Sequence, residues 1–286
     1  MNGIDIIRLD DFLKLALYED VGTGDITTEA TIPEDARIEG RYVAKDDGII
    51  CGTEVCRRVF DLVGGDVITE FYKKDGDAVK RDDIIGKVAG NARSVLTGER
   101  LGLNIMQHLS GIATKTKYYV DAVAGTGAMI ADTRKATPGM RELEKYAVRV
   151  GGGHNHRMNL SDGVLIKDNH IVAAGGIKNA VAAAKKYAPH TMKIEVEVEN
   201  EDEIREALDA GADVIMLDNM SIEDMAAAVK LIGGRAVVEA SGNMGDKTTD
   251  ELREVAETGV DLISIGALTH SVKAFDISLK FTLKTK

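Results

Sequence analysis

The chain of 286 residues has no tryptophan, only three prolines, only two cysteines and few aromatic residues (4%). The two cysteines, Cys51 and Cys56, exclude a disulfide framework, and no further Cys or His stands at the spacing of a zinc site. No apolar run approaches the roughly 18 residues that a membrane span needs. The first residues carry acids among their apolar positions and do not follow the pattern of a signal peptide. We therefore expect a cytoplasmic protein with reduced thiols.

Basic residues are also in the minority, because 47 acidic residues face 36 basic ones and give a net charge of −11. This charge disfavours nucleic acid and anionic membranes as partners. One stretch departs from the average, since residues 133–157 hold six Lys/Arg against two Glu, a net +4. The remaining 30 basic and 45 acidic residues sum to −15. The sequence therefore predicts one basic region in an acidic protein.

From about residue 130 onward, short apolar strands alternate with amphipathic helical segments. This alternation is typical of parallel strands joined by helical crossovers. We predict six strands, at 128–134, 163–169, 193–199, 213–219, 236–242 and 261–267. Glycines that we expect to close helices in the left-handed conformation are Gly151, Gly211, Gly233 and Gly259. The pattern predicts a parallel barrel or a doubly wound sheet over residues 126–286.

The first 125 residues follow another pattern. Residues 37–52 and 66–90 mix β-rich runs with Asp-Gly turn signals, which predicts antiparallel strands in a small sheet or sandwich. We therefore expect an α+β, sandwich-like N-terminal domain over 1–125, and residues 272–286 could pack back on it.

A long helix is predicted from about Ser94 to Ala124. Its apolar face contains Leu101, Ile105, Leu109 and Ile112. Its polar stripe contains Arg100, Asn104 and Gln107. The stripe fits either a solvated face or the wall of a site.

The predicted strand 193–199 alternates between apolar residues and Glu195, Glu197 and Glu199. Because the outer face of such a sheet packs on helices, the glutamates should point to the lumen or its mouth. Three other strands place polar residues on one face in the same way. The residues that lie on the same face are Leu165 with Lys167, Met216 with Asp218, and Glu239 with Ser241. Charge in a lumen requires internal Lys–Glu pairs or a charged ligand, and the pattern leaves both open.

Cationic residues gather at or near the ends of the first two strands, namely Arg134, Lys135, His156, Arg157 and Lys167. Such a group suits a ligand with several negative charges, because Arg binds carboxylate or phosphate through two parallel hydrogen bonds. Glu197 and Asp218 end the next two strands. These carboxylates either hold Mg²⁺ together with substrate phosphates or neutralise the arginines.

Glycine-containing turns follow the last two strands, at Ser241-Gly242-Asn243 and Ser264-Ile265-Gly266. Loops at these positions commonly bind phosphate through backbone N–H groups. The remaining histidines receive no role from these patterns; they include His108, His154, His170 and His270.

Several stretches together resemble the quinolinate phosphoribosyltransferase family. They are EDVGTGDITT (19–28), TGERLGLNIMQHLSGIAT (97–114), DTRKATPGMRELEKYAVRVGGGHNHRMNLSD (132–162), LIKDNH (165–170), EVEVEN (195–200), IMLDN (215–219), EASGNM (239–244) and DLISIGALTHS (261–271). They cover almost the whole chain in order. The resemblance implies an incomplete parallel βα barrel of seven strands, so one strand is expected beyond the six above.

The resemblance also implies an activity. Quinolinate and 5-phosphoribosyl-1-diphosphate would give nicotinate mononucleotide, CO₂ and diphosphate in NAD biosynthesis, with Mg²⁺ accompanying the phosphoribosyl donor. The family forms homodimers, which could assemble further.

Site residues carried over from the family fall into two groups. The carboxylates of quinolinate are held by Arg134, His156, Arg157 and Lys167, joined by Arg100 of the partner subunit. The donor and its metal are contacted by Lys135, Glu197, Asp218, Ser241, Gly242, Asn243, Ser264, Ile265 and Gly266. Thr133 is expected to bind substrate as well. Within these groups Lys135, Lys167, Glu197 and Asp218 are the expected catalytic residues, and Glu197 and Asp218 the expected metal ligands.

Three other functions stay open at this point. A related phosphoribosyltransferase could take another acceptor, such as nicotinate, but an acceptor with one carboxylate would not need so many cations. Lys167 at a strand end could be the Schiff-base lysine of a barrel aldolase. A binding module for anions would have little use for the opposing carboxylates.

Overall fold

The computed structural model describes residues 4–282, and the chain divides into two compact units. Within the described residues, the first unit takes 4–115, 138–151 and 272–282, and the second takes Thr116–Thr137 and Gly152–Ser271. This division differs from a boundary at residue 125, because residues 116–125 belong to the second unit and residues 138–151 to the first. The described C-terminal segment lies with the first unit, which the sequence had left open. No helix of the described chain is long and apolar enough to cross a membrane.

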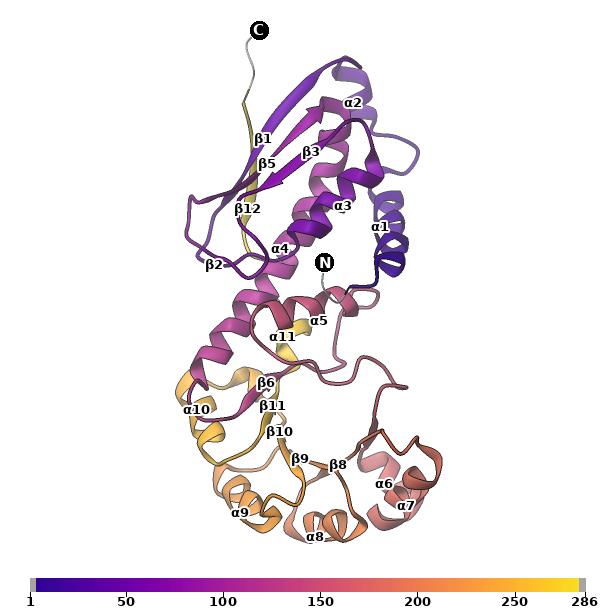
Figure 1. The fold of residues 1–286 in the computed structure, drawn as a ribbon, viewed down its shortest axis with the longest axis vertical. Coiled ribbons are helices and arrows are strands. Elements are labelled where there is room, and N and C mark those ends of the chain that lie inside the picture. The colour runs from indigo at the N-terminus through magenta and orange to yellow at the C-terminus, as the bar shows by residue number, and fades with distance from the viewer. Residues whose placement is uncertain (1–3, 283–286) are drawn as a thin grey trace. The chain divides into compact units, whose positions relative to one another are not determined.

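The first unit is built around an antiparallel sheet in the order β12-β1-β5-β3, as predicted for this part of the chain. A second, two-stranded sheet pairs β2 with β4. The elements are α1 (Ile6–Val21), α2 (Ile26–Thr31), β1 (Arg37–Ala44), β2 (Gly48–Ile49), α3 (Thr53–Val63), β3 (Ile68–Phe71), β4 (Ala78–Val79), β5 (Ile84–Asn91), α4 (Ala92–Ala122, entering the second unit at Thr116), α5 (Arg141–Val150) and β12 (Ile277–Thr282) (Figure 1).

The core of this unit is apolar and includes residues from the C-terminal segment. Tyr42, Phe60 and Val88 are buried in it together with Phe275 and Ile277. Strand β12 pairs antiparallel with β1 along its length, with Tyr42 opposite Leu279. The sheet therefore depends on residues that lie more than 230 positions apart in the sequence.

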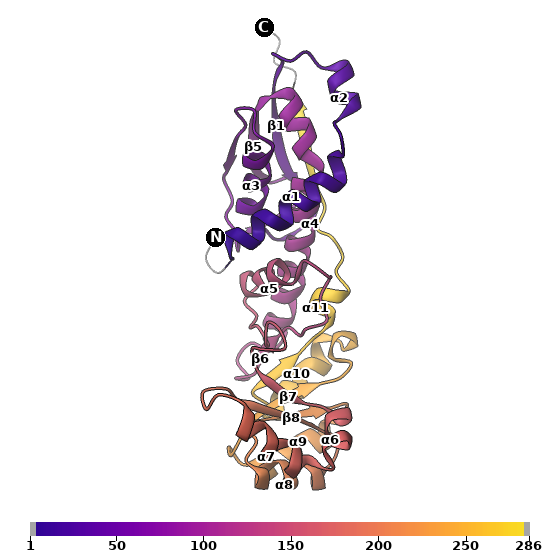
Figure 2. The ribbon, with the colours of Figure 1, turned by 90° about the vertical axis from the view of Figure 1, so that its right-hand side faces the viewer.

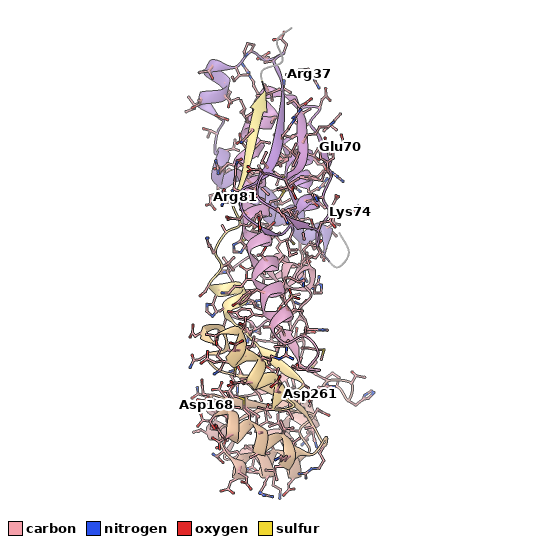
Figure 3. The ribbon with its side chains drawn as sticks, turned by 90° about the vertical axis from the view of Figure 1, so that its left-hand side faces the viewer. Arg37, Glu70, Lys74, Arg81, Asp168 and Asp261 are labelled. Carbon is pink, nitrogen blue, oxygen red and sulfur yellow. The ribbon has the colours of Figure 1, made fainter. Side chains whose placement is uncertain are left out.

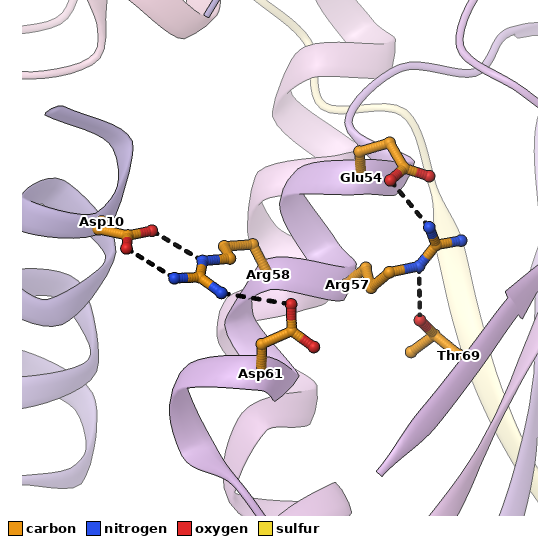
Figure 4. Close-up of polar contacts among 6 residues, drawn as sticks. All are labelled: Asp10, Glu54, Arg57, Arg58, Asp61 and Thr69. Atoms are coloured by element: carbon orange, nitrogen blue, oxygen red, sulfur yellow. Dashed lines mark hydrogen bonds and ion pairs between the residues drawn. The ribbon is translucent and has the colours of Figure 1, made fainter. Parts of the chain in front are cut away.

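Charged side chains of the antiparallel sheet and its loops point away from this core. Arg37 on β1 and Glu70 on β3 are exposed (Figure 3). Ionic contacts lie on this outer side, among them Lys87 with Glu70 across β5 and β3. Two arginines of α3 form others, Arg57 with Glu54 and Arg58 with Asp10 and Asp61 (Figure 4). The Arg58 guanidinium donates to both oxygens of Asp10, at 2.8 and 2.6 Å, and lowers the pKa of that carboxyl.

The long helix α4 begins and ends two residues before its predicted limits. The predicted apolar face is buried in full, from Leu101 to Ile112. The polar stripe is divided: Arg100 and Asn104 are exposed, whereas the side chain of Gln107 donates to the backbone carbonyl of Ile277 at 2.8 Å. Gln107 thus anchors the C-terminal segment.

The second unit contains a parallel sheet in the order β6-β11-β10-β9-β8-β7, which confirms the six predicted strands. Figures 1 and 2 show its helices along one face of the strands. The elements are β6 (Met129–Ala131), β7 (Val164–Ile166), α6 (Asp168–Ala174), α7 (Ile177–Tyr187), β8 (Ile194–Val198), α8 (Glu201–Ala210), β9 (Val214–Asp218), α9 (Ile222–Ile232), β10 (Val237–Ser241), the 3₁₀ turn η1 (Met244–Asp246), α10 (Thr249–Glu257), β11 (Leu262–Ser264) and α11 (Ala267–His270).

Short polar residues start the helices that follow these strands. Asn200, Ser221 and Thr248 each accept the backbone N–H three residues later, which satisfies a donor that the first turn leaves open. Strands β8, β9 and β10 therefore pass into their helices through defined turns, and the residues at these strand ends are held in place.

Two of the four predicted glycine caps need correction. Gly211 and Gly233 end their helices in the left-handed conformation. Gly151 is right-handed, with φ −74°, and Gly152 takes the left-handed position instead (φ 89°). Gly259 has φ 93° but lies one residue beyond the cap, which is Thr258. Local sequence does not distinguish adjacent positions at such a turn.

The sheet is open between β6 and β7 within residues 4–282, as an incomplete barrel requires. A single parallel bridge joins Ala131 to His154 on the free edge of β6. The seventh strand expected from the family is therefore not a full strand in the described chain. The single bridge at His154 stands next to β6 instead.

Candidate active site

A cavity of about 480 Å³ lies at the carboxyl ends of the strands in the second unit. Its lining consists of Thr133, Arg134, Lys135, His156, Arg157, Leu165, Lys167, Glu197, Met216, Asp218, Asn219, Glu239, Ser241, Gly242, Asn243 and Ser264. Loops and strand ends of parallel sheets meet at this edge, which is where α/β enzymes bind their ligands. Twelve of the expected site residues are brought together here.

Three expected residues lie outside this lining. Arg100 is exposed on α4 in the first unit. Ile265 is buried, and its backbone N–H donates to the carbonyl of Ala131 at 2.9 Å. Gly266 packs close to the side chain of Lys135: a Cβ there would lie 3.0 Å from Lys135 Cδ. Gly266 therefore makes room for the lysine stem.

Strand register explains why the charged residues meet. Met216 of β9 is aligned with Glu197 of β8 on one side and with Glu239 of β10 on the other. Asp218 is aligned with Ser241 one layer further along. Because side chains alternate across a strand, these residues all project from the face opposite the helices.

Lys167 and Glu197 form an ion pair inside this cavity, with Nζ and Oε2 2.7 Å apart. The pair realises one of the internal Lys–Glu contacts that the strand pattern allowed. The amine is occupied by this carboxylate, whereas a Schiff-base lysine needs a free amine to attack a carbonyl. The geometry therefore disfavours the aldolase alternative.

The turn after β10 is shaped by a close approach to the turn after β9. Gly242 has φ 88°, and a Cβ at this residue would lie 2.2 Å from Oδ1 of Asn219 and 2.8 Å from its backbone nitrogen. Asn219 in turn donates to Asp218 Oδ2 at 2.8 Å and accepts from Asn243 at 3.2 Å. The glycine is required because no side chain fits between the two turns.

Arg157 is held near a second guanidinium. Its Nη1 donates to the carbonyl of Gly163 at 2.9 Å. Burial, and then the positive charge of Arg134, lower the pKa of Arg157. Two guanidinium groups that repel each other at the wall of a cavity favour an anion that contacts both.

Two buried glutamates lie behind His156. Nε2 of His156 is 3.1 Å from Glu195 Oε2 and 3.7 Å from Glu239 Oε2. Nδ1 accepts the backbone N–H of Arg157 at 2.7 Å, so the proton of a neutral ring lies on Nε2 and faces the glutamates. Burial and the charge of Glu195 raise the pKa of Glu239 to about 7.

The same three side chains offer ligand atoms within 4.8 Å of one another. A metal-bound histidine normally donates a hydrogen bond from its other ring nitrogen. Here Nδ1 of His156 accepts one instead, which would leave a metal-bound ring without a proton. The arrangement is therefore a hydrogen-bonded network and not a metal centre.

Four lining residues were absent from the expected site: Leu165, Met216, Asn219 and Glu239. Strand alternation had already placed Leu165, Met216 and Glu239 on the correct face, so that signal could have found them. Asn219 carries a subtler signal, because Asn tolerates the left-handed conformation (φ 54°) that this turn needs.

The histidines without an expected role make local contacts. Nε2 of His108 lies 2.9 Å from the buried carboxylate of Glu144 within the first unit. Nδ1 of His170 accepts the backbone N–H of Lys167 at the start of α6, and His270 is hydrogen-bonded to Ser271. His154 contributes its backbone to the bridge with β6.

Comparisons with known proteins agree with this geometry. Residues 25–110 match the N-terminal domain, and residues 112–280 the C-terminal domain, of quinolinate phosphoribosyl transferase. The chain is 44% identical to a probable carboxylating nicotinate-nucleotide pyrophosphorylase of Bacillus subtilis, over 98% of this chain and 96% of that protein. It is 46% identical to a chloroplastic carboxylating nicotinate-nucleotide pyrophosphorylase of Arabidopsis thaliana, over 94% and 81%.

Solved structures are similar along the full length. The crystal structure of NadC from Streptococcus pyogenes superposes with a TM-score of 0.93 at 43% identity and covers 99% of both chains. The nicotinate-nucleotide pyrophosphorylase from Francisella tularensis gives 0.92 at 40% identity over 98% of both chains. The chain therefore belongs to the quinolinate phosphoribosyltransferase family.

Proposed function

We propose that this protein transfers the phosphoribosyl group of 5-phosphoribosyl-1-diphosphate to quinolinate with loss of CO₂, giving nicotinate mononucleotide and diphosphate for NAD biosynthesis. The observation that carries the proposal is a single cavity with cations on one side and Glu197 and Asp218 on the other. The names of the Bacillus and Arabidopsis relatives support the same reaction.

The acceptor is held by its two adjacent carboxylates. Arg134 and Arg157 lie close enough to repel each other, so a dicarboxylate relieves more repulsion than a monocarboxylate does. His156 and Lys167 complete this side of the cavity. Quinolinate should therefore be preferred over nicotinate.

The phosphoribosyl donor occupies the side with carboxylates and glycine-containing turns. Glu197 and Asp218 supply the hard carboxylate oxygens that Mg²⁺ prefers, so these residues fit the ion. Bound there with the donor, Mg²⁺ would neutralise charge on the departing diphosphate. Lys135, whose backbone carbonyl is fixed by Thr269 at 2.7 Å, adds a cation for the phosphates, and Gly242 lets backbone approach them.

The chemistry uses these groups in sequence. The bond from ribose C1 to diphosphate breaks, and the oxocarbenium-like charge at C1 is stabilised by the carboxylate of Glu197. The pyridine nitrogen forms the new bond to C1 and becomes quaternary. The adjacent carboxylate then leaves as CO₂, its bonding electrons stay on the ring carbon beside the positive nitrogen, and that carbon takes up one proton.

The assembly we propose is a homodimer in which Arg100 of the partner subunit completes the acceptor pocket. Arg100 is exposed on the surface of the first unit and has no place in the cavity lining of its own chain. An exposed arginine next to Asn104 suits contact with an anion.

The cytoplasm is the compartment we propose. Cys51 and Cys56 are both free and buried, which fits a protein that folds under reducing conditions.

Release of CO₂ tests the reaction directly. With quinolinate labelled in its 2-carboxylate, we expect labelled CO₂ to appear in a 1:1 ratio with diphosphate, only when 5-phosphoribosyl-1-diphosphate and Mg²⁺ are both present. Chelation of Mg²⁺ should stop the release, and added Mg²⁺ should restore it. Equal turnover of nicotinate, or CO₂ release without the donor, would contradict the proposal.

A further inference from the structure

Asp132 is a fully buried carboxylate directly after β6. It immediately precedes Thr133, Arg134 and Lys135, which line the cavity. Its Oδ1 accepts the backbone N–H of His156 at 2.8 Å, and its Oδ2 accepts from the side-chain amide of Asn155 at 2.6 Å. One buried side chain therefore joins two cation-bearing segments that are more than 20 residues apart in the sequence.

Backbone hydrogen bonds lead up to this contact. The N–H of His154 donates to the carbonyl of Ile130 at 2.8 Å, and the N–H of Asp132 donates to the carbonyl of His154 at 3.1 Å. These bonds form the single bridge on the free edge of β6. The Asp132 side chain extends the pairing past the last backbone bond, toward the residues that face the cavity.

What this pairing fixes is the spacing of two like charges. Arg134 lies two residues after Asp132, and Arg157 lies directly after His156. Both guanidinium groups line the cavity, and the pKa of Arg157 is lowered first by burial and then by the positive charge of Arg134, so the two groups repel each other. This repulsion favours separation of the two segments and a wider acceptor pocket, and the Asp132 contacts oppose it together with the backbone bonds of the bridge.

The residue types fit this role in the orientation that the structure shows. Asp132 must accept two hydrogen bonds, which a carboxylate does and a carboxamide in the same orientation does not. Asn155 must donate, because a second carboxylate would repel the first. Exchanging both residues preserves the pairing, since Asn at 132 can accept from His156 and donate to Asp at 155.

We propose that Asp132 and Asn155 are a positioning pair that sets the separation of Arg134 and Arg157 and thereby fits the pocket to two adjacent carboxylates. The inference rests on the proposed function for the identity of the ligand, and on the geometry above for the role of the pair. Neither residue touches the substrate in this role.

Three variants test the pair: D132N, N155D and the exchange D132N/N155D. Binding is measured by calorimetry with phthalate, which carries two adjacent carboxylates on a ring that lacks the attacking nitrogen. We expect N155D, which places two carboxylates together, to weaken phthalate binding and raise the KM for quinolinate by about 10-fold, with the KM for the donor little changed. D132N should have a smaller effect in the same direction, because Asn155 can reverse its amide and accept from the new carboxamide. The exchange should recover most of this loss. D162N is the matched control, because Asp162 accepts the N–H of Met158 in an exposed turn of the same loop.

The outcomes separate the inference from the proposed function. Phthalate binding and quinolinate KM at wild-type values in both single variants would overturn the inference, as would folded single variants that the exchange fails to rescue. Thermal unfolding of each variant shows whether it folds, and rescue by the exchange supports the pair even where a single variant is unstable. If the wild type binds phthalate more tightly than the single variants but does not turn over quinolinate, the positioning pair stands and the proposed reaction fails.

Discussion

The two sheets of this molecule treat charge in opposite ways. The antiparallel sheet covers a core of apolar side chains such as Phe60 and Val88, and its ionic contacts, including those of Arg58, lie at partly exposed positions. The parallel sheet buries Glu195 and Glu239 on the face opposite its helices, beneath the cationic wall of a cavity.

This difference in the burial of charged groups reflects the roles of the two sheets. A buried charge costs several kcal/mol unless hydrogen bonds and opposite charges compensate for it, so a fold gains nothing from it in an ordinary core. The parallel sheet retains such groups at its ligand-binding edge. The first sheet contributes stability, and the second accepts a stability cost in exchange for chemistry.

The largest expected effect comes from removing a cation of the cavity. Arg134→Ala should lower kcat/KM for quinolinate by about 2–4 kcal/mol, which is roughly 30- to 1000-fold, because a carboxylate loses a charged two-point contact. Steady-state kinetics with both substrates measures the loss. Arg41→Ala, the same change at an exposed residue of β1, should leave the value within about two-fold. Normal turnover of quinolinate by Arg134→Ala would remove the arginine from the site.

Glu239 should make stability depend on pH. Its folded pKa of about 7 lies above the ordinary 4.5, so the folded state binds the proton more tightly than the unfolded state does. The free energy of unfolding should therefore fall by about 3 kcal/mol as pH rises from near 4.5 to about 7, and Glu239→Gln should abolish this decline.

Urea unfolding at pH 5 and pH 7.5 measures this decline. The matched control is Glu251→Gln, because Thr248 lowers the pKa of that exposed carboxyl and gives it the opposite pH dependence. If the unfolding free energy of Glu239→Gln fell with rising pH as much as that of the wild type, Glu239 would not be the source of this pH dependence.

Gly242→Ala should combine strain with a clash. The positive φ and the approach of Asn219 leave no room for a Cβ, so we expect a loss of about 1–2 kcal/mol in unfolding free energy together with a raised KM for the phosphoribosyl donor. Gly234→Ala separates the two causes, because Gly234 has a similar φ of 76° with open space around it. If Gly242→Ala and Gly234→Ala changed stability and KM equally, the close approach of Asn219 to Gly242 would have no effect of its own.

The smallest effect on activity is expected from a change in the first unit, at Arg58 of α3. Arg58→Met removes the contacts with Asp10 and Asp61, so Tm should fall while kcat/KM stays within about two-fold of the wild type. Thermal unfolding and steady-state kinetics on the same preparation check both parts. A large loss of activity without a change in Tm would contradict the division of roles between the sheets.

Much of the fold could be predicted because its signals are local. Helix α4 and the six parallel strands follow from the spacing of apolar residues within each segment. The glycine at position 151 shows the limit of local information, since the left-handed residue is its neighbour Gly152. The pairing of β12 with β1 depends on contacts between distant residues, which a pattern within either segment cannot reveal.

The candidate site shows the same limit. Alternation along β10 placed Glu239 on the lumen face, but only cross-strand register shows that it meets His156 and Glu195. Gln107 belonged to a convincing polar stripe and is instead bonded to Ile277. In both cases the deciding partner lies more than 40 residues away in the sequence.

The position of β12 has a consequence for the order of folding during synthesis. The ribosome completes residues 116–271 before it makes Ile277, so the second unit can finish its sheet while the first still lacks an edge strand. Until then, β1 exposes one row of unsatisfied backbone groups, and the places of Phe275 and Ile277 in the core stay open to water. The catalytic barrel can therefore form first, and the part of the molecule with the earliest residues is the last to close.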